Sequence, residues 1–333
     1  MRSKKFVRFF LRKLYQVEYV FLKSAFKVVS PQIALTYDPI SKQDGLGAQL
    51  QRILAIKSLC KDLRISYIHN GVADIAIHPL DLLNSASEIK NFLDRVNQIF
   101  YIESTKDQFF KEAKTYQIRS LSNSSLALFL AKFVFFRRPM ILSTVEPYGC
   151  SDLFPSMYEG ISRNLPTLKL HPVESSAIAI HYRRGSGNFD VQKGEASSRE
   201  LEISVLLKKC NEIVSANRGI SEVFIFTDAA PDDSIFSPPE HQRNAWVTNK
   251  NFDGENLVSK GIDVHSNFSS LQVPFTVVSG GNPLDSLVAL AQFDFLILSR
   301  SSFGYVSALL GDRKQVWLPK DFWHPPLPKW FTY

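Results

Sequence analysis

The sequence predicts an α/β protein made of two units, each with a parallel sheet. Three observations carry this prediction. One series of apolar strands alternating with amphipathic helices begins near residue 33, and a second begins at Ala177. Between them, residues 139–172 contain five prolines, which is typical of a crossing between domains. A chain of 333 residues is also long enough for two hydrophobic cores.

The first series has the pattern of one βαβ unit. Its helix is indicated by apolar residues that recur every three or four positions. The predicted order is a strand at 33–40, a glycine turn at Gly45 and Gly47, a helix at 48–63 and a strand at 65–69. We expect residues 81–140 to form mostly helices and loops.

The second series is longer and ends near the carboxyl terminus. Its predicted elements are strand 178–182, helix 199–216, strand 223–227, helix 284–292, strand 295–298, helix 302–310 and strand 316–318. Residues 229–283 are expected to be rich in loops. Together the two series indicate two Rossmann-like lobes with a cleft between them, which is an α/β architecture.

The charge of the chain is concentrated at its amino terminus. The net charge is +7, from 39 basic and 32 acidic residues. Residues 1–30 hold this whole excess, because they contain eight Lys and Arg side chains and a single acidic one, Glu18. The rest of the chain is balanced, so its charge does not indicate a nucleic-acid-binding surface.

We interpret residues 1–30 as a basic amphipathic helix that lies on an anionic membrane. Their longest uncharged run, Tyr19 to Leu22, is too short to cross a bilayer, and there is no signal-peptide pattern. The alternative is a leader helix that packs on the body or frays. Three widely spaced cysteines are expected to be reduced thiols of a cytoplasmic protein: Cys60, Cys150 and Cys210.

Residues 177–188, AIAIHYRRGSGN, carry the most informative motif of the chain. Arg183 and Arg184 stand at the end of a predicted strand and before two glycines. Open α/β sheets bind ligands just past the carboxyl ends of their strands. Arginine presents a planar fork of donors that matches phosphate oxygens. The motif therefore predicts a phosphate or diphosphate site; the alternative is a solvated arginine pair.

Two further segments have the pattern of phosphate-binding loops. Gly45 and Gly47 follow a strand and precede a helix, where a ligand can approach backbone N–H groups; the alternative is a plain tight turn. Position 50 is Leu and the next strand ends without an acid, so a nicotinamide cofactor is not expected. Ser301 and Ser302 begin a predicted helix, where they either bind phosphate or only cap it.

The sequence lacks several patterns that would indicate other chemistry. It has no P-loop, no H-E-x-x-H motif and no clustered His and Cys. It also has no D-x-D pair, which many sugar transferases use to hold a cation on the donor diphosphate. We therefore expect no metal and no cofactor, with arginines neutralising the diphosphate instead.

These motifs resemble those of metal-independent fucosyltransferases of the GT-B type, the α-1,2, α-1,6 and protein O-fucosyl groups. The H-x-R-R element of that superfamily is matched at residues 181–184, and its final element is similar to Asp285, Asp294, Ser301 and Ser302. The early G-G-L-G-N-Q element resembles residues 44–49. Ser186 stands where the family often has an acid.

The resemblance implies a GT-B fold, a GDP-fucose donor and a glycan or glycolipid acceptor. Donor contacts are implied for Arg183 and Arg184 at the diphosphate, His181 and Asp285 near the nucleoside, Asp228 at the base or ribose, and Ser301 and Ser302 at the phosphates. The acceptor is implied to enter near Asp44, Gly45, Gly47 and Gln49.

Transfer to a sugar hydroxyl requires a group that takes the acceptor proton. Asp190, Glu195 and Asp44 are candidates for this base, beside Arg183 as the group that stabilises the leaving diphosphate. For each carboxylate, surface solvation is the alternative. Three other functions remain open: a transferase with another nucleotide sugar, a non-catalytic nucleotide- or glycan-binding protein, and a membrane-anchored scaffold.

Overall fold

The chain forms two compact units in a computed structural model. Unit 1 comprises residues 1–42, 52–73 and 100–159, and unit 2 comprises residues 43–51, 74–99 and 160–333. The structure describes residues 2–39, 45–75, 85–101, 104, 110–146, 177–183, 189–190, 195–196, 201–227, 264–279, 282–311, 315–320, 322, 326–327 and 329–333.

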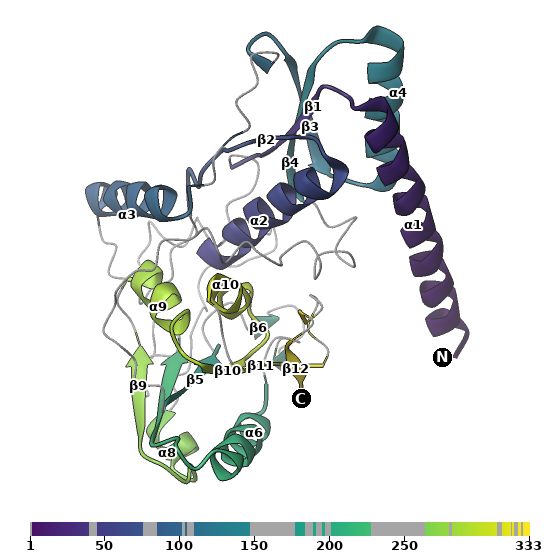
Figure 1. The fold of residues 1–333 in the computed structure, drawn as a ribbon. Helices are drawn as coiled ribbons and strands as arrows, with labels where there is room; N and C mark the ends of the chain where they lie inside the picture. Colours follow the sequence, from purple (N-terminus) through teal and green to yellow (C-terminus); the bar gives the residue numbers. More distant parts are fainter. Residues whose placement is uncertain are drawn as a thin grey trace. The chain divides into compact units, whose positions relative to one another are not determined.

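Unit 1 is built on a four-stranded parallel sheet with the order β2-β1-β4-β3 (Figure 1). Its strands are β1 (Ile33–Tyr37), β2 (Ser66–Ile68), β3 (Lys114–Ser120) and β4 (Met140–Glu146). All five residues of β1 are buried, as expected of a central strand that is covered on both faces. Helix α2 (Leu46–Leu63) begins in unit 2 and ends in unit 1.

Two helices lie side by side in unit 1, α1 (Arg2–Val29) and α4 (Asn123–Phe136) (Figure 1). A capping box starts α4, because Ser122 and Ser125 satisfy each other's backbone N–H groups. Asn123 then joins the two helices by donating its side-chain amide to the Tyr15 carbonyl over 2.9 Å. Among the described residues, no helix is long and apolar enough to cross a bilayer.

Unit 2 contains a six-stranded parallel sheet with the order β12-β11-β10-β5-β8-β9. Its central strands are almost wholly apolar and buried. The strands are β5 (Ala177–Tyr182), β8 (Glu222–Thr227), β9 (Phe275–Ser279), β10 (Phe295–Leu298), β11 (Gln315–Leu318) and β12 (Phe331–Thr332). Two-residue strands β6 (Phe189–Asp190) and β7 (Glu195–Ala196) pair separately as an antiparallel hairpin.

Four described helices alternate with the strands of the unit 2 sheet: α6 (Ile203–Ala216), α8 (Val264–Phe268), α9 (Pro283–Leu290) and α10 (Ser302–Leu310). Helix α3 (Ala86–Ile99) belongs to the same unit, although it lies between β2 and β3 of unit 1 in the sequence. Helix α6 packs on the sheet through its buried side chains Leu206, Cys210 and Ile213. They form one core cluster with Ile178, Ile180 and Ile225 of β5 and β8. Phe295 of β10 and Trp317 of β11 belong to the same cluster, which therefore also covers the strands next to β5 on the side away from β8.

The predicted α/β class with two Rossmann-like units is confirmed by these two parallel sheets. The cleft between the units stays a prediction. Three strands lie in stretches for which the sequence indicated no strand. Strands β3 and β4 occupy part of the stretches expected to be helix, loop and proline-rich crossing. Strand β9 lies in the stretch expected to be loops, 229–283. Edge strand β3 escaped notice because most of its side chains are exposed and polar.

Two of the three cysteines lie among the described residues. Cys60 and Cys210 are free and buried. Burial raises the pKa of each thiol to about 12, so both stay protonated and unreactive near neutral pH. Cys150 lies outside the described residues.

Candidate functional site

The candidate site lies in unit 2, where β5 and β10 end next to each other. These strands are parallel partners, with Leu298 opposite His181. His181 lies near the end of β5 and Arg183 directly follows this strand, while the serine loop, residues 299–302, follows β10. Because the carboxyl ends of parallel strands meet at one edge, the two predicted motifs are brought together at the place where such sheets bind ligands.

Ser299 joins the two strand ends through its side chain. Its hydroxyl oxygen lies 3.0 Å from His181 Nδ1 and accepts a 3.1 Å hydrogen bond from the backbone N–H of Arg183. The Ser299 backbone N–H donates to the His181 carbonyl over 2.9 Å. Ser299 is 1% exposed, so these contacts are shielded from water. They fix the direction in which the chain leaves β5 and carries Arg183.

Ser301 has two roles in the described structure. As the N-cap of α10 it accepts a hydrogen bond from the Phe303 backbone N–H over 3.2 Å. The same oxygen accepts from Arg183 Nη1 over 3.3 Å. The predicted alternatives for Ser301, capping and membership of an anion site, are therefore compatible in geometry. The half-buried guanidinium of Arg183 is held beside the amino end of α10, where the helix dipole is positive.

His181 is a packed residue of this edge. Its side chain is buried and stacks on the ring of Phe303, with ring centres 5.7 Å apart and an angle of 28°. Gly304 follows, and a Cβ atom built there would lie 3.0 Å from His181 Nδ1. The first turn of α10 therefore packs directly on the imidazole ring. This close packing requires a residue as small as glycine at position 304.

The predicted glycine turn reaches the same helix end. Gly45 directly precedes α2, and its carbonyl accepts from the backbone N–H groups of Ala48 and Gln49 in the first turn. A Cβ atom on Gly47 would lie 2.4 Å from Phe303 Cα and 2.5 Å from Phe303 N. Within unit 2, the first turns of α2 and α10 therefore meet backbone to backbone, as only a glycine permits.

Two other predicted residues are engaged in contacts that the sequence did not reveal. Gln49 is fully buried and donates its Nε2 to the Asp74 carbonyl over 2.6 Å. Asp285, in the first turn of α9, pairs with Arg95 of α3 over 3.0 Å. Both partners of that pair are about half exposed, so it contributes only about 0–1 kcal/mol.

Several predicted residues are not placed by the structure. Asp44, Arg184, Asp228 and Ser186 lie outside the described residues. Asp190 and Glu195 face each other in the backbone register of the β6–β7 hairpin, but their side chains lie outside the description. Ser302 is the first residue of α10 and is half-buried. Their roles remain as predicted from the sequence.

The described part of the chain contains no cluster of three His, Cys, Asp or Glu residues that would hold a metal ion. The arrangement at the end of β5 is cationic and rich in hydrogen-bond donors, which suits an anion and repels a cation. The chemistry of the donors therefore fits a phosphate group.

Tyr333 holds the end of β10, from which the serine loop starts. Its hydroxyl donates to the Leu298 carbonyl over 2.7 Å, and its backbone N–H donates to the Leu318 carbonyl. Burial raises the pKa of Tyr333, despite the nearby charge of Arg300, so the phenol keeps the proton it donates. Sequence reasoning missed Tyr333 because this contact is set by tertiary structure.

Ser299, Phe303 and Gly304 were also missed as individual residues. They lie on either side of Ser301 and Ser302, for which the sequence indicated phosphate binding or helix capping. The sequence signal that could have identified them is their position. Ser299 directly follows β10, and Phe303 and Gly304 lie in the first turn of α10. What the sequence did not reveal is that they contact His181 and Arg183 of another strand.

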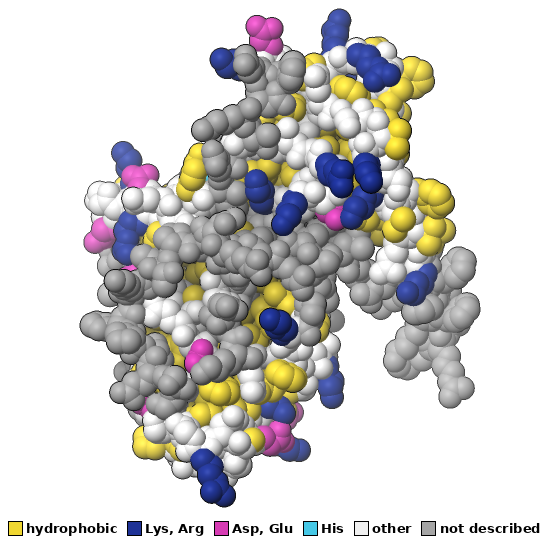
Figure 2. All heavy atoms as spheres, in the orientation of Figure 1, with side chains coloured by type: hydrophobic (Ala, Val, Ile, Leu, Met, Phe, Trp, Pro, Cys, Tyr) yellow, Lys and Arg dark blue, Asp and Glu magenta, His cyan; other side chains and the backbone are white. Residues whose placement is uncertain are grey.

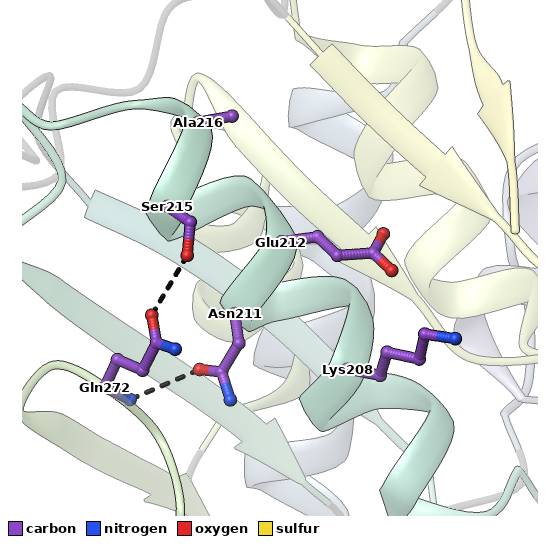
Figure 3. A pocket seen from close by; sticks show the side chains of 6 residues that line it. All are labelled: Lys208, Asn211, Glu212, Ser215, Ala216 and Gln272. Atoms are coloured by element: carbon purple, nitrogen blue, oxygen red, sulfur yellow. Dashed lines mark hydrogen bonds between the residues drawn. The ribbon is translucent and has the colours of Figure 1, made fainter.

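A pocket on α6 lies at the edge of the sheet opposite to the one where phosphate binding is expected. It is lined by Lys208, Asn211, Glu212, Ser215, Ala216 and Gln272 (Figure 3). Gln272 precedes β9 and Ala216 precedes β8, so the pocket lies by the amino ends of the strands. Gln272 is tied to Asn211 and Ser215 by hydrogen bonds, which leaves these polar groups engaged.

No protein-family model and no curated protein matches the sequence. Among solved structures, the chain is similar to POFUT1 in complex with GDP, with 12% identity, a TM-score of 0.43, and coverage of 91% of this chain and 98% of that one. The complex of POFUT1 with GDP-fucose matches with the same identity and TM-score. The E. coli heptosyltransferase WaaC with ADP-2-deoxy-2-fluoro heptose matches at 10% identity and a TM-score of 0.35, covering 90% of this chain and 92% of that one.

Proposed function

We propose that this protein is a metal-independent glycosyltransferase that moves a sugar from a nucleotide diphosphate to a hydroxyl of a glycan or glycolipid. GDP-fucose is the proposed donor, and transfer inverts the anomeric centre. The observation that carries the proposal is the position of Arg183. Its backbone is held by Ser299 and its guanidinium by Ser301, at the carboxyl edge of a parallel sheet and beside a helix amino terminus.

This geometry suits a diphosphate for three physical reasons. A guanidinium offers two parallel N–H donors to phosphate oxygens and keeps its charge at any pH of interest. The amino end of α10 adds a partial positive charge and backbone donors. Ser299 and Ser301 are each 1% exposed, so the loop that presents these donors is fixed before the ligand arrives.

In the proposed reaction the anomeric C–O bond to the diphosphate breaks, and the acceptor oxygen forms a bond to the same carbon. The electron pair of the broken bond stays on the leaving nucleotide. Arg183 and the serine loop stabilise that developing charge. The acceptor proton passes to a carboxylate, for which Asp190, Glu195 and Asp44 remain the candidates.

Nucleotide binding to the purified chain tests the donor assignment. We expect GDP to raise the melting temperature more than UDP, CMP or ADP does, because a ligand bound only by the folded state stabilises it. A larger shift with another nucleotide would replace GDP-fucose with a different donor. Binding of GDP without donor hydrolysis or transfer would instead indicate a non-catalytic nucleotide-binding protein.

Replacement of Arg183 tests the site itself. Arg183→Ala should lose the GDP-induced shift and transferase activity while the melting temperature without ligand stays close to that of the native chain. Arg218→Ala, at an exposed arginine that follows α6 in the same unit, is the matched control and should behave as native. Undiminished GDP binding in Arg183→Ala would refute the diphosphate assignment.

A further inference from the structure

Helix α1 has an apolar stripe on each of two opposite sides. Tyr19, Leu22 and Phe26 are buried against unit 1. Val17, Phe21 and Val28 are exposed, and at about 3.6 residues per turn they fall on the far side of the helix. Phe21 is 72% exposed. Packing on the body therefore explains one stripe of α1 and leaves the other in solvent.

Helix α4 repeats this arrangement. Leu126, Leu130 and Phe133 are buried, whereas Leu128 and Phe135 lie seven residues apart on the opposite, exposed side. Phe135 is 82% exposed, and Phe136 beside it is also exposed. Isolated exposed apolar residues are ordinary, but a stripe of exposed aliphatic and aromatic side chains on each of two neighbouring helices marks an interaction surface.

The two exposed stripes point the same way. The crossovers β1 to β2 and β3 to β4 step in the same direction through the sheet, so right-handed connections place α2 and α4 on one face. Helix α1 contacts both helices, α4 through Tyr15 and Asn123, and α2 through Tyr19 and Asp62. It therefore lies on that face too, and both stripes are directed away from the sheet.

Basic side chains border these stripes. Lys13 and Lys27 of α1 are exposed, as are Arg137 and Arg138 at the end of α4. Figure 2 shows hydrophobic and basic side chains next to one another over this part of unit 1, at the right of the view. The part of α1 before residue 13 adds five further basic residues in the sequence and no acidic one.

We propose that the two-helix face, formed by Val17, Phe21 and Val28 of α1 with Leu128, Phe135 and Phe136 of α4, binds the surface of an anionic lipid bilayer. Its exposed aromatic and aliphatic side chains enter the headgroup boundary, and its basic border pairs with lipid phosphates. This goes beyond the amphipathic helix predicted from the sequence, because α4 supplies half of the surface. The proposal is independent of the proposed transferase activity.

Charge favours a bilayer over a second copy of the chain as the occupant. In a symmetric dimer the same patch meets itself, which would bring the basic borders of the two copies, each with Lys13, Lys27, Arg137 and Arg138, towards one another. Anionic lipids instead supply the opposite charge along this basic border.

Vesicle co-sedimentation of the full chain tests the proposal. We expect binding to phosphatidylcholine vesicles that contain phosphatidylglycerol, and little binding to phosphatidylcholine alone. The double variant Val28→Ser/Phe135→Ser removes apolar area from both helices and should weaken binding about tenfold. The variant Val205→Ser/Phe331→Ser makes the same chemical change at exposed positions of unit 2 and should bind as the native chain does.

A charge-reversal pair provides a second measurement that leaves the apolar stripes intact. Lys27→Glu/Arg138→Glu should weaken binding by more than about tenfold. Lys90→Glu/Lys208→Glu has the same net charge but changes exposed residues of α3 and α6, and should retain binding. Equal losses in both charge variants, or native binding by the Val28/Phe135 variant, would overturn the proposal. So would self-association without vesicles that Val28→Ser/Phe135→Ser abolishes, because the occupant would then be a second copy.

Discussion

Gly47 packs so closely on Phe303 that a Cβ atom at position 47 would lie 2.4 Å from the Phe303 Cα atom. Phe303 cannot move freely, because its ring stacks on His181 and its backbone N–H donates to Ser301. The clash would involve backbone atoms, which cannot rotate away as a side chain does. Gly47 thus couples the start of α2 to the site edge within unit 2.

Gly47→Ala should therefore lower the free energy of unfolding by about 1–3 kcal/mol and weaken nucleotide binding, because α10 must shift. Urea unfolding and GDP-induced thermal shifts measure the two effects. Gly45→Ala is the matched control: it lies two residues earlier, and a Cβ atom there meets nothing within 4 Å. Native stability and native GDP binding in Gly47→Ala would show that the contact with Phe303 is not as tight as described.

Ser299→Ala should weaken nucleotide binding as well as stability. It removes the hydroxyl that contacts His181 and accepts from the Arg183 backbone, leaving buried polar groups unsatisfied at a cost of about 1–3 kcal/mol. The backbone that carries Arg183 is then less firmly held. Calorimetric titration with GDP measures the loss.

The control for Ser299→Ala is Ser58→Ala. Ser58 is also buried, and its hydroxyl donates to the Leu54 carbonyl inside α2 of unit 1. This variant should lower stability to a similar or smaller extent and leave GDP binding unchanged. Equal GDP affinity in Ser299→Ala and the native chain would refute a positioning role for Ser299.

The sequence revealed elements whose patterns are local. Strand β10 matched its predicted bounds because four consecutive apolar residues precede a run of serines. Strand β3 was missed because its neighbour β4, not its own side chains, holds it in the sheet. An edge strand with exposed polar residues has little periodic signal.

The site shows the same division. Arg183 and Ser301 were both predicted because each follows a strand and belongs to a phosphate-binding pattern. The contact between them depends on the pairing of β5 with β10, which no local pattern specifies. Likewise, Gly47 was noted as a turn glycine, but its reason for being glycine lies 256 residues away, at Phe303.

Activity should survive removal of divalent cations. If Arg183 and the amino end of α10 neutralise the diphosphate, no cation is required there. We expect equal rates of sugar transfer in EDTA and in buffer with added Mg²⁺ or Mn²⁺. A loss of activity in EDTA that Mn²⁺ restores would refute the metal-independent mechanism while leaving the nucleotide-binding result unaffected.

The stability of unit 1 should decrease in mild acid because of His69. Its Nδ1 atom lies 2.8 Å from the Tyr67 hydroxyl, and burial, reinforced by Lys57, lowers its pKa below the ordinary 6.5. Below that value the unfolded chain binds a proton more readily than the folded one, so the free energy of unfolding falls as pH drops from 6.5 towards the lower, folded-state pKa. Urea unfolding followed from about pH 7.5 to about pH 5.5 measures this slope.

The variant His69→Asn isolates the contribution of this imidazole, because an amide retains a polar group near the Tyr67 hydroxyl but does not titrate. Its stability should change less with pH than that of the native chain, and the two curves should converge in acid as the native chain loses its advantage. Parallel curves for the two proteins would assign the acid sensitivity to other groups and contradict the lowered pKa of His69.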